Sequence, residues 1–422
     1  MSDAVDLFVE DARTISVADA ADRLGLGGLR RAGTAERIGP CPACGGTDRF
    51  GINTSRNVWN CRGGGGGHDA IGMAAHVLGL DVTRRDDFLE ACSAVTGQAV
   101  PDGQGESEER RQLRLAQLVE RRRLAEERAD RREAETNAYR EGERQKARDK
   151  WRQGLPGLPT VDAYLRARLG GHELPPLPFL RGVEREFYWH GEGEGGPVLL
   201  HTGVAMVAPF VDPAGLVIGC HLTWLDQHGP KGRPLLVDGG GERLPTKKMR
   251  GTKKGGLIPL VGWTMVGGTI LPDLARRRLV VGEGIENTVA AAVVEMEGDP
   301  ELFARSLYAA AGDLGNLAGP ADPKSSFTHP SLKRPDKNGK PRAVRVQGHD
   351  PKPDQALDDA FQPPAHVDEI LLLGDADSEP VATMAAMMRA RARLGGKGRA
   401  WIAWPPAGKD FADVLCGVSE AA

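Results

Sequence analysis

Apolar residues recur at helical spacing in three short stretches of the first hundred residues. Residues 14–26 form the first stretch, with Ser16 placed as its N-cap, and residues 69–79 and 86–96 form the other two. A cysteine-bearing segment separates the first stretch from the second. The pattern predicts a small domain over residues 1–100.

A charged segment replaces this pattern. Between residues 106 and 150 the chain has 14 Lys or Arg, 12 Asp or Glu, no proline and few large apolar side chains. Such a segment buries little surface, so we predict a long solvated helical linker over residues 101–150, with ion pairs between charges four residues apart. Because the charges nearly cancel, a spacer is favoured over an arm that binds nucleic acid.

Residues 151–275 combine one short helical stretch with strand-like runs. A helix is predicted at residues 161–170, and strands are predicted at 203–210, 216–224 and 256–261. We interpret this part of the chain as the first subdomain of a two-part core.

Strands and helices alternate over residues 276–422. Strands are predicted at 279–284, 306–312, 369–377 and 399–406, and helices at 287–297 and 381–394. This alternation is typical of an α/β domain with a parallel or mostly parallel sheet. A polar, proline-bearing stretch at 319–365 interrupts it, and we predict a surface insertion there that is mobile.

The composition of the chain limits the number of domains and the kinds of site it can have, but it does not indicate a function. The 422 residues leave room for two or three domains, and a net charge of −3 means that any surface for nucleic acid must be local. There is no apolar stretch long enough for a membrane span, and the acidic first residues do not form a signal peptide. We therefore expect a cytoplasmic protein whose clustered cysteines bind metal.

Three of the six cysteines lie close together in the chain. Cys41 and Cys44 form a knuckle, and sixteen residues separate Cys44 from Cys61. The turn inside such a knuckle points both sulfur atoms at one metal ion, and a second knuckle normally completes a tetrahedral zinc site. Here the second knuckle lacks its last cysteine, because that position is Gly64 within a run of five glycines.

The fourth ligand is therefore open. His68 is the nearest substitute, since a glycine-rich loop can bring its imidazole to the metal, so we predict a zinc site made by Cys41, Cys44, Cys61 and His68. His76 and Cys92 are weaker candidates because each is expected inside a helix. The alternative is a ribbon that has lost zinc and is held by packing.

The sequence GPCPACGGTDRFGINTSRNVWNCRG, followed by GGHDAIG and a helix, resembles the zinc-binding module of phage and plasmid primases. The likeness covers residues 14–97, and Asp48, Arg49 and Phe50 fall on the DRF motif of that family. In such modules the ribbon helps to read a single-stranded template. The resemblance makes Arg49, Arg56 and Trp59 plausible contacts with DNA, through charge and stacking, although Trp59 is equally suited to the core.

Acidic residues stand where parallel sheets present their chemistry, just after the carboxyl ends of strands. Glu283 follows one apolar run, Asp375 and Asp377 follow another, and Asp410 lies in the sequence PPAGKDFADVL. Clustered carboxylates together with substrate phosphates are the usual site of Mg²⁺. Two such ions can activate an attacking hydroxyl and stabilise a departing pyrophosphate.

The order of these acids resembles the Toprim domain that bacterial-type primases share with type IA and type II topoisomerases and some nucleases. The likeness covers residues 276–417 and implies a Rossmann-like catalytic domain. Glu283 falls on the Toprim glutamate, and Asp375 and Asp377 fall on its DxD motif. The resemblance extends to positions near these acids: Asp410 on an acid that primases add, Asp413 after it, Asn287 where primases often carry aspartate, and Glu286 beside it.

Residues 243–254 contain six cations and no acid. The cations are Arg243, Lys247, Lys248, Arg250, Lys253 and Lys254. Such a patch suits the phosphates of a nucleotide or a template strand, and it resembles the basic motif just upstream of Toprim in primases. The alternative is a solvated loop.

Together these features favour a magnesium-dependent DNA primase that synthesises RNA primers from NTPs on single-stranded DNA. The chain contains no GxxxxGK[ST] motif, so the expected partner is a separate helicase, and the expected location is the nucleoid. A Toprim nuclease or topoisomerase is the second hypothesis, but none of the four tyrosines has the context of a topoisomerase nucleophile. An accessory protein that binds single-stranded DNA without catalysis is the third.

Overall fold

The computed structural model describes residues 3–32, 35–101, 108–193, 196–335, 340–395 and 399–417. The chain forms two compact units, residues 1–137 and residues 138–422. The divisions predicted at 150 and 275 both fall inside the second unit, and the four-segment division stays a prediction. No helix among the described residues is long and apolar enough to cross a membrane.

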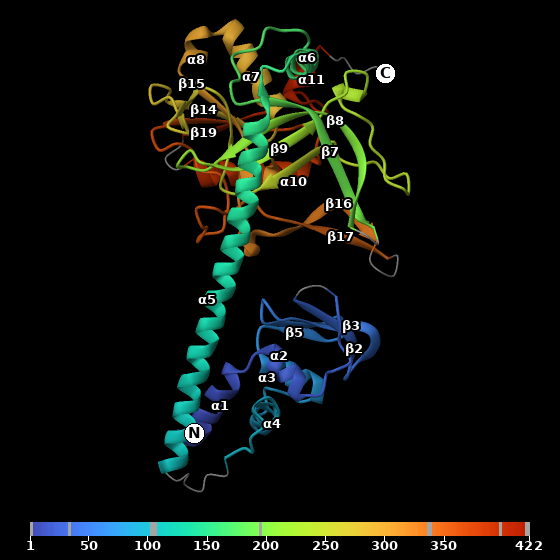
Figure 1. The fold of residues 1–422 in the computed structure, drawn as a ribbon, viewed down its shortest axis with the longest axis vertical. Coiled ribbons are helices and arrows are strands. Elements are labelled where there is room, and N and C mark those ends of the chain that lie inside the picture. Colours follow the sequence, from blue (N-terminus) through green and yellow to red (C-terminus); the bar gives the residue numbers. More distant parts are fainter. Residues whose placement is uncertain are drawn as a thin grey trace. The chain divides into compact units, whose positions relative to one another are not determined.

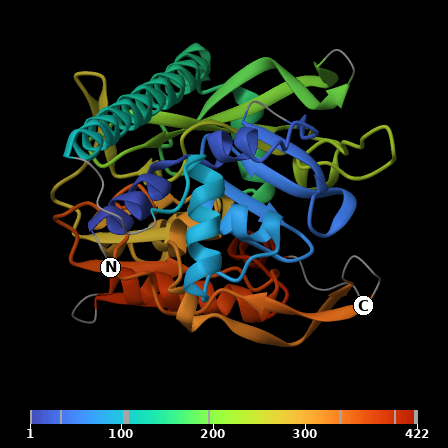
Figure 2. The ribbon, with the colours of Figure 1, turned by 90° about the horizontal axis from the view of Figure 1, so that it is seen from below.

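The first unit packs four helices against an antiparallel sheet with the strand order β1-β2-β3-β4-β5 (Figures 1 and 2). The strands are β1 (Arg30–Arg31), β2 (Glu36–Cys41), β3 (Gly45–Asn53), β4 (Val58–Cys61) and β5 (Gly65–Gly67). The helices are α1 (Asp3–Thr14), α2 (Val17–Arg23), α3 (Ala70–Leu78) and α4 (Arg85–Thr96). Phe8, Phe50 and Met73 are fully buried in the core that the helices and the sheet share.

The helices of this unit begin and end where short-range signals place them. Ser16 caps α2 by accepting a hydrogen bond from the backbone N–H of Asp19, and Asp69 caps α3 in the same way through Gly72. Gly79 ends α3 in the left-handed conformation that glycine adopts without strain. The three predicted helices are therefore confirmed, whereas α1 was not predicted.

The charged segment is a single helix, α5 (Glu108–Gln153), as the charge pattern predicted. Arg123 forms ion pairs with Glu120 and Glu127, one turn away on either side. The last turns differ from the predicted solvated linker, because Trp151 is buried in the core of the second unit and its indole N–H donates to the carbonyl of Phe179 at 2.9 Å. The end of α5 is thus part of the second unit.

One sheet of the second unit is antiparallel, with the order β10-β9-β8-β7-β6. Its strands are β6 (Leu155–Pro156), β7 (Arg181–Gly193), β8 (Gly196–Val211), β9 (Val217–Trp224) and β10 (Lys247–Gly251). Nearby elements are α6 (Pro159–Arg168), the 3₁₀ turn η1 (Pro230–Gly232) and the hairpin of β12 (Trp263–Val266) and β13 (Thr269–Pro272). The helix predicted at 161–170 and the strands predicted at 203–210 and 216–224 are confirmed.

The other sheet has the order β11-β15-β14-β18-β19, and all its strand pairs are parallel except the pair of β11 with β15. The strands are β11 (Ile258–Val261), β14 (Arg278–Gly282), β15 (Ser306–Ala310), β18 (Glu369–Leu373) and β19 (Ala400–Ala403). The accompanying helices are α7 (Ile285–Gly298), α8 (Pro300–Ala304), α9 (Leu314–Ala318), α10 (Pro380–Leu394) and α11 (Phe411–Leu415). The prediction of a mostly parallel sheet in an α/β protein is confirmed.

The stretch at 319–365 contains a hairpin that its polar composition did not predict, and the mobility of this insertion stays a prediction. β16 (Phe327–Pro335) pairs with β17 (Pro341–Val346), after the 3₁₀ turn η2 (Pro323–Ser325). The base of the insertion is fastened to α10, because the buried guanidinium group of Arg389 donates to the carbonyls of Gly319 and Gly348.

Candidate metal centre and acidic pocket

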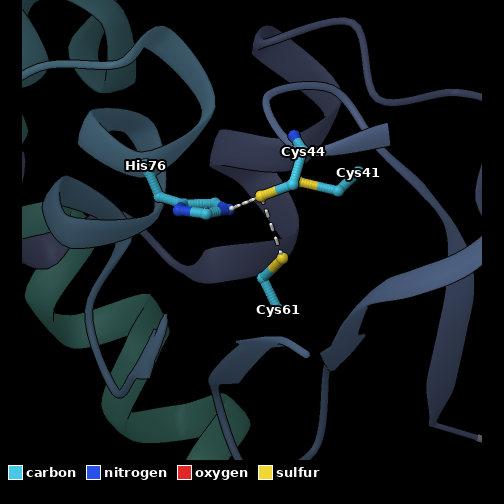
Figure 3. Close-up of side chains that lie close together, drawn as sticks. All are labelled: Cys41, Cys44, Cys61 and His76. Carbon is cyan, nitrogen blue, oxygen red and sulfur yellow. Dashed lines mark hydrogen bonds between the residues drawn. The ribbon is translucent and has the colours of Figure 1, made fainter. Parts of the chain in front are cut away.

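Four sulfur and nitrogen ligands converge in the first unit (Figure 3). Cys41 ends β2, Cys44 follows in the turn to β3, Cys61 ends β4, and His76 comes from α3. One ligand atom from each residue lies within 4.8 Å of all the others, and the His76 Nε2 atom is 3.3 Å from the Cys41 sulfur. The backbone N–H of Cys44 donates to the Cys41 sulfur at 3.3 Å, which holds the knuckle turn.

The structure corrects the prediction that His68 is the fourth ligand. The glycine run is not a free loop, because Gly65, Gly66 and Gly67 form β5 and pair with β4. His68 follows this strand as an exposed residue outside the cluster. His76, the weaker candidate, completes the group.

The absence of a side chain at Gly64 leaves room for the His76 ring to act as the fourth ligand in place of a cysteine. A side chain at this position would place its Cβ atom 3.1 Å from the His76 ring and 3.7 Å from the Cys44 sulfur. The space beside the metal centre at residue 64 is therefore taken by the imidazole of His76.

These residues fit a zinc ion. Three cysteines and one histidine form a common tetrahedral donor set of structural zinc sites. Burial raises the pKa of the Cys41 thiol, but hydrogen bonds from the backbone of Cys44 and from His76 outweigh it and lower this pKa to about 6. Hydrogen bonds with Cys41 and Cys61 instead raise the pKa of the Cys44 thiol to about 11. Because the thiolate is the form that binds metal, the ion must displace protons from this group as it binds.

Trp59 belongs to the core and not to an exposed stacking surface. Its side chain is 6% exposed, and its ring lies 5.2 Å from the His76 ring and 6.1 Å from the Phe50 ring. The predicted stacking contact of Trp59 with DNA is therefore not supported by its position, because burial keeps its ring from a base. Arg49 and Arg56 are exposed, and their contacts with DNA stay predictions.

In the second unit, the four predicted acids line one cavity of about 220 Å³. Glu283 follows β14, and Asp375 and Asp377 follow β18, its parallel neighbour, so their positions come from strands that end at the same edge of the sheet. Asp410 caps α11 at the same cavity. The strand-end pattern in the sequence thus predicted which acids meet.

The acids of this pocket repel one another. Burial, followed by the charges of Glu283, Asp377 and Asp410, raises the pKa of Asp375 to about 7. Burial also raises the pKa of Glu283, against a hydrogen bond from the backbone of Leu314. Negative charge is therefore concentrated here at a free-energy cost, which a bound cation would offset.

Asn287 holds Asp375 in place. Its side-chain amide donates to Asp375, and its oxygen accepts from the backbone N–H of Ala412 at 3.3 Å. The residue at this position is an amide rather than the aspartate frequent in primases, so it orients an acid without adding a further charge.

Asp410 is set apart from Glu283 and Asp375, whose partners are neutral hydrogen-bond donors, by an ion pair with an arginine. It lies 3.4 Å from a guanidinium nitrogen of Arg168 and accepts a hydrogen bond from the backbone of Asp413. Asp413 itself pairs with Arg168 at 3.1 Å and with Lys231 at 3.0 Å. Asp410 and Asp413 thus help to fix α11, and Glu283, Asp375 and Asp377 are the stronger candidates for metal.

The middle of the basic segment is the edge strand β10 (Lys247–Gly251), so the segment is not one continuous loop patch. Lys247 and Lys248 pair with adjacent positions of β9 in the antiparallel ladder, so their side chains leave on opposite faces. Lys247 lines the acidic pocket and binds Glu286 at 2.9 Å, whereas Lys248 lies 3.7 Å from the centre of the Tyr188 ring.

The remaining predicted cations lie in different settings. Arg243, Arg250 and Lys254 are exposed, and Lys253 forms an ion pair with Asp313. Alternation along β10 separates Lys247 from Lys248 and Arg250, whereas Lys253 and Lys254 follow the end of the strand. Only Lys247 of the predicted group lines the acidic pocket.

Sequence reasoning missed part of the pocket wall. The missed residues are Arg168, His221, Lys231 and Arg233. Burial, with the nearby charge of Lys247, lowers the pKa of His221 to about 4, so its ring is neutral at physiological pH. These residues come from α6, β9 and the η1 turn, and no local motif marks them.

Comparisons with known proteins give limited matches. Residues 141–260 match the model of a domain family of unknown function, DUF7146, and no curated protein matches. A crystal structure of the zinc-binding and RNA polymerase domains of the Aquifex aeolicus primase is similar over 98% of this chain and 82% of that chain. The sequence identity is 14% and the TM-score is 0.30, so this similarity does not establish a shared fold or function.

Proposed function

We propose that this chain is a DNA primase, which joins ribonucleotides on a single-stranded DNA template. The observation that supports it most is the pocket in which Glu283, Asp375 and Asp377 face Lys247. Acids that bind metal beside cations that bind phosphate are the groups that transfer of a nucleotide needs. The metal centre of the first unit, with its likeness in sequence to primase zinc modules, adds a second element expected of such an enzyme.

The acidic pocket suits Mg²⁺ bound partly through water and phosphate. In the part of the chain that the structure describes, only the cysteine–histidine cluster brings three or more ligand atoms within 4.8 Å of one another. The carboxylates are therefore spaced too widely to enclose an ion by themselves. Mg²⁺ keeps several waters and is commonly held by one or two carboxylates together with substrate phosphates.

In the proposed reaction the 3′-hydroxyl of one ribonucleotide attacks the α-phosphate of the next. A new P–O bond forms as the hydroxyl proton passes to water, and pyrophosphate leaves with the electrons of the broken P–O bond. Magnesium would neutralise the developing charge. Lys247, with Arg168, Lys231 and Arg233 around the same cavity, would hold the triphosphate. A separate helicase is the partner that we propose for opening the template.

The test is primer synthesis on single-stranded DNA with labelled NTPs, Mg²⁺ and the full chain. We expect short RNA products from the wild type and at least a hundredfold less from Asp375→Ala/Asp377→Ala, because oriented charge typically contributes such factors. Asp368→Ala is the matched control, since Asp368 is 68% exposed and lies just before the other end of β18. It should synthesise primers at the wild-type rate.

Two outcomes would overturn the proposal. Degradation of the template in place of synthesis would assign the same acids to a nuclease. Binding of DNA with neither synthesis nor degradation would assign the chain to accessory proteins that bind single strands.

A further inference from the structure

The β16–β17 hairpin concentrates positive charge on a chain whose net charge is −3. Its described residues, 327–335 and 340–346, include five cations and no acid. The cations are Lys333, Arg334, Lys340, Arg342 and Arg345, and all five are exposed. A local patch of this kind is what binding of a polyanion requires when the whole chain carries the opposite sign.

The strand register places these cations on both faces of the ribbon. Arg334 lies directly opposite Arg342, so their side chains leave on one face, whereas Lys333 lies opposite Ala343 and leaves on the other. Neither Lys333 nor Arg334 forms an ion pair with any residue in the described ranges. Their charges are therefore available to an external anion.

The base of the ribbon is joined to the edge of the sheet that carries the acidic pocket. His329 of β16 is buried, and its Nε2 atom lies 2.9 Å from Glu379. Glu379 accepts hydrogen bonds from the backbone N–H groups of Val381 and Ala382, and so caps α10. This cap stands two residues after Asp377, so the ribbon begins beside the loop that carries the acids.

We propose that the β16–β17 hairpin binds the phosphate backbone of the single-stranded DNA that enters the acidic pocket. A flexible single strand can contact cations on both faces of a narrow ribbon, whereas a stiff duplex of that length follows one face. The attachment through His329 and Glu379 brings that strand toward Asp375 and Asp377. This inference rests on the proposed function only for the identity of the strand, because the binding itself needs no catalysis.

The test measures binding of a fluorescent oligodeoxynucleotide to the full chain by anisotropy, across a range of salt concentrations. The variant is Lys333→Ala/Arg334→Ala. We expect its affinity to fall about tenfold, and the slope of log K against log salt to become shallower by about 1.4, since each phosphate contact on a single strand contributes about 0.7.

Two control variants separate this effect from general charge and from folding. Arg277→Ala/Arg305→Ala removes the same charge at the opposite end of the parallel sheet, from arginines that are 55% and 61% exposed, and should bind like the wild type. Lys333→Arg/Arg334→Lys keeps the charge and should also bind like the wild type. Thermal unfolding of all three variants checks that the fold is intact.

Wild-type affinity and slope in Lys333→Ala/Arg334→Ala would overturn the inference. Primer synthesis is measured separately on the same samples. If the wild type makes no primer but the hairpin variant still loses DNA affinity, the proposed function fails while this inference stands.

Discussion

At the scale of single residues, the metal centre depends on a pair of positions that compensate each other. Gly64 stands where a second knuckle would have a cysteine. His76 fills the space beside Gly64 from α3, which begins six residues later. Histidine from a helix is a rigid ligand, because the backbone of α3 is fixed at both ends by Asp69 and Gly79. The centre is therefore built by tertiary packing as well as by local spacing.

We expect His76→Ala to lose zinc at least tenfold more readily than the wild type, because one of four ligands is gone. His68→Ala is the matched control and should retain one zinc ion per chain. Metal content after dialysis against a graded chelator measures both. Equal loss in the two variants would show that His76 is not a ligand.

A rescue variant tests the same geometry more sharply. Gly64→Cys/His76→Ala should recover zinc, because removing the imidazole opens the space in which the Cβ atom of residue 64 lies, 3.7 Å from the Cys44 sulfur. Gly64→Cys alone should be destabilised by the contact with the His76 ring. Failure of the double variant to bind more zinc than His76→Ala would contradict this account.

The half-buried carboxylate of Asp375 lowers the stability of the folded protein when it is ionised, because it lies beside other acids. Its pKa is raised to about 7, from 3.8, so the folded protein holds this proton more tightly than the unfolded chain does. Stability from that proton is present at low pH and is lost as the pH rises from about 4 to 7. We expect Asp375→Asn, in magnesium-free buffer, to gain a few kcal/mol over the wild type at pH 8 and much less at pH 5.

Denaturant unfolding at both pH values measures this difference. Asp368→Asn is the control, because the pKa of Asp368 is lowered by its hydrogen bond from Arg277, and its effect should not grow with pH in this way. A stability gain of Asp375→Asn that is equal at pH 5 and pH 8 would argue against the repulsion described for the pocket.

At the scale of elements, alternation along β10 places Lys247 on one face of the sheet and Lys248 and Arg250 on the other. Lys247 faces the pocket and neutralises Glu286, a buried carboxylate that also accepts a hydrogen bond from the Tyr164 hydroxyl at 2.6 Å. Burial raises the pKa of Glu286, but Lys247 and Tyr164 outweigh it and hold the pKa well below its usual range. Position along the strand, and not charge alone, decides what each cation does.

Lys247→Ala should therefore destabilise the protein by about 2 kcal/mol at neutral pH, because it leaves Glu286 buried without its cation. Arg250→Ala, an exposed cation of the same strand, should change stability by less than about 0.5 kcal/mol. Adding Glu286→Gln to Lys247→Ala should recover most of the loss. Chemical denaturation of the four proteins checks this, and an equal effect of both alanine variants would contradict it.

The sequence predicted some residues of the two sites and missed others, depending on whether their contacts follow a local pattern. Glu283, Asp375 and Asp377 were found because acids at strand ends follow a local pattern that the parallel sheet brings together. His68 was preferred over His76 because five glycines suggest a flexible loop, and only the pairing with β4 turns them into a strand. Arg168 of the pocket could not be predicted, since its contacts with Asp410 and Asp413 span more than 240 residues.

At the scale of the whole molecule, each compact unit has its own core. The buried residues of the first unit form one cluster, whereas those of the second unit form two others, and α5 contributes its final turns to the latter. Calorimetry should therefore show two unfolding transitions. A zinc chelator should lower the unfolding temperature of the first unit by more than 10 °C and leave that of the second unit unchanged. A shift of both temperatures would show that the cores unfold together.

The hydrogen bonds that Arg389 donates at the base of the insertion have a consequence for which parts of the ribbon can change. One buried guanidinium group binds both carbonyls at the base of the insertion, at Gly319 and Gly348. These bonds fix the two ends of the insertion to α10, and His329 fastens its first strand to Glu379 beside the acids. Changes confined to the exposed outer part of the ribbon, at Lys333 and Arg334, would therefore alter its charge and leave these contacts in place, so the reach for DNA and the chemistry of the pocket are separable.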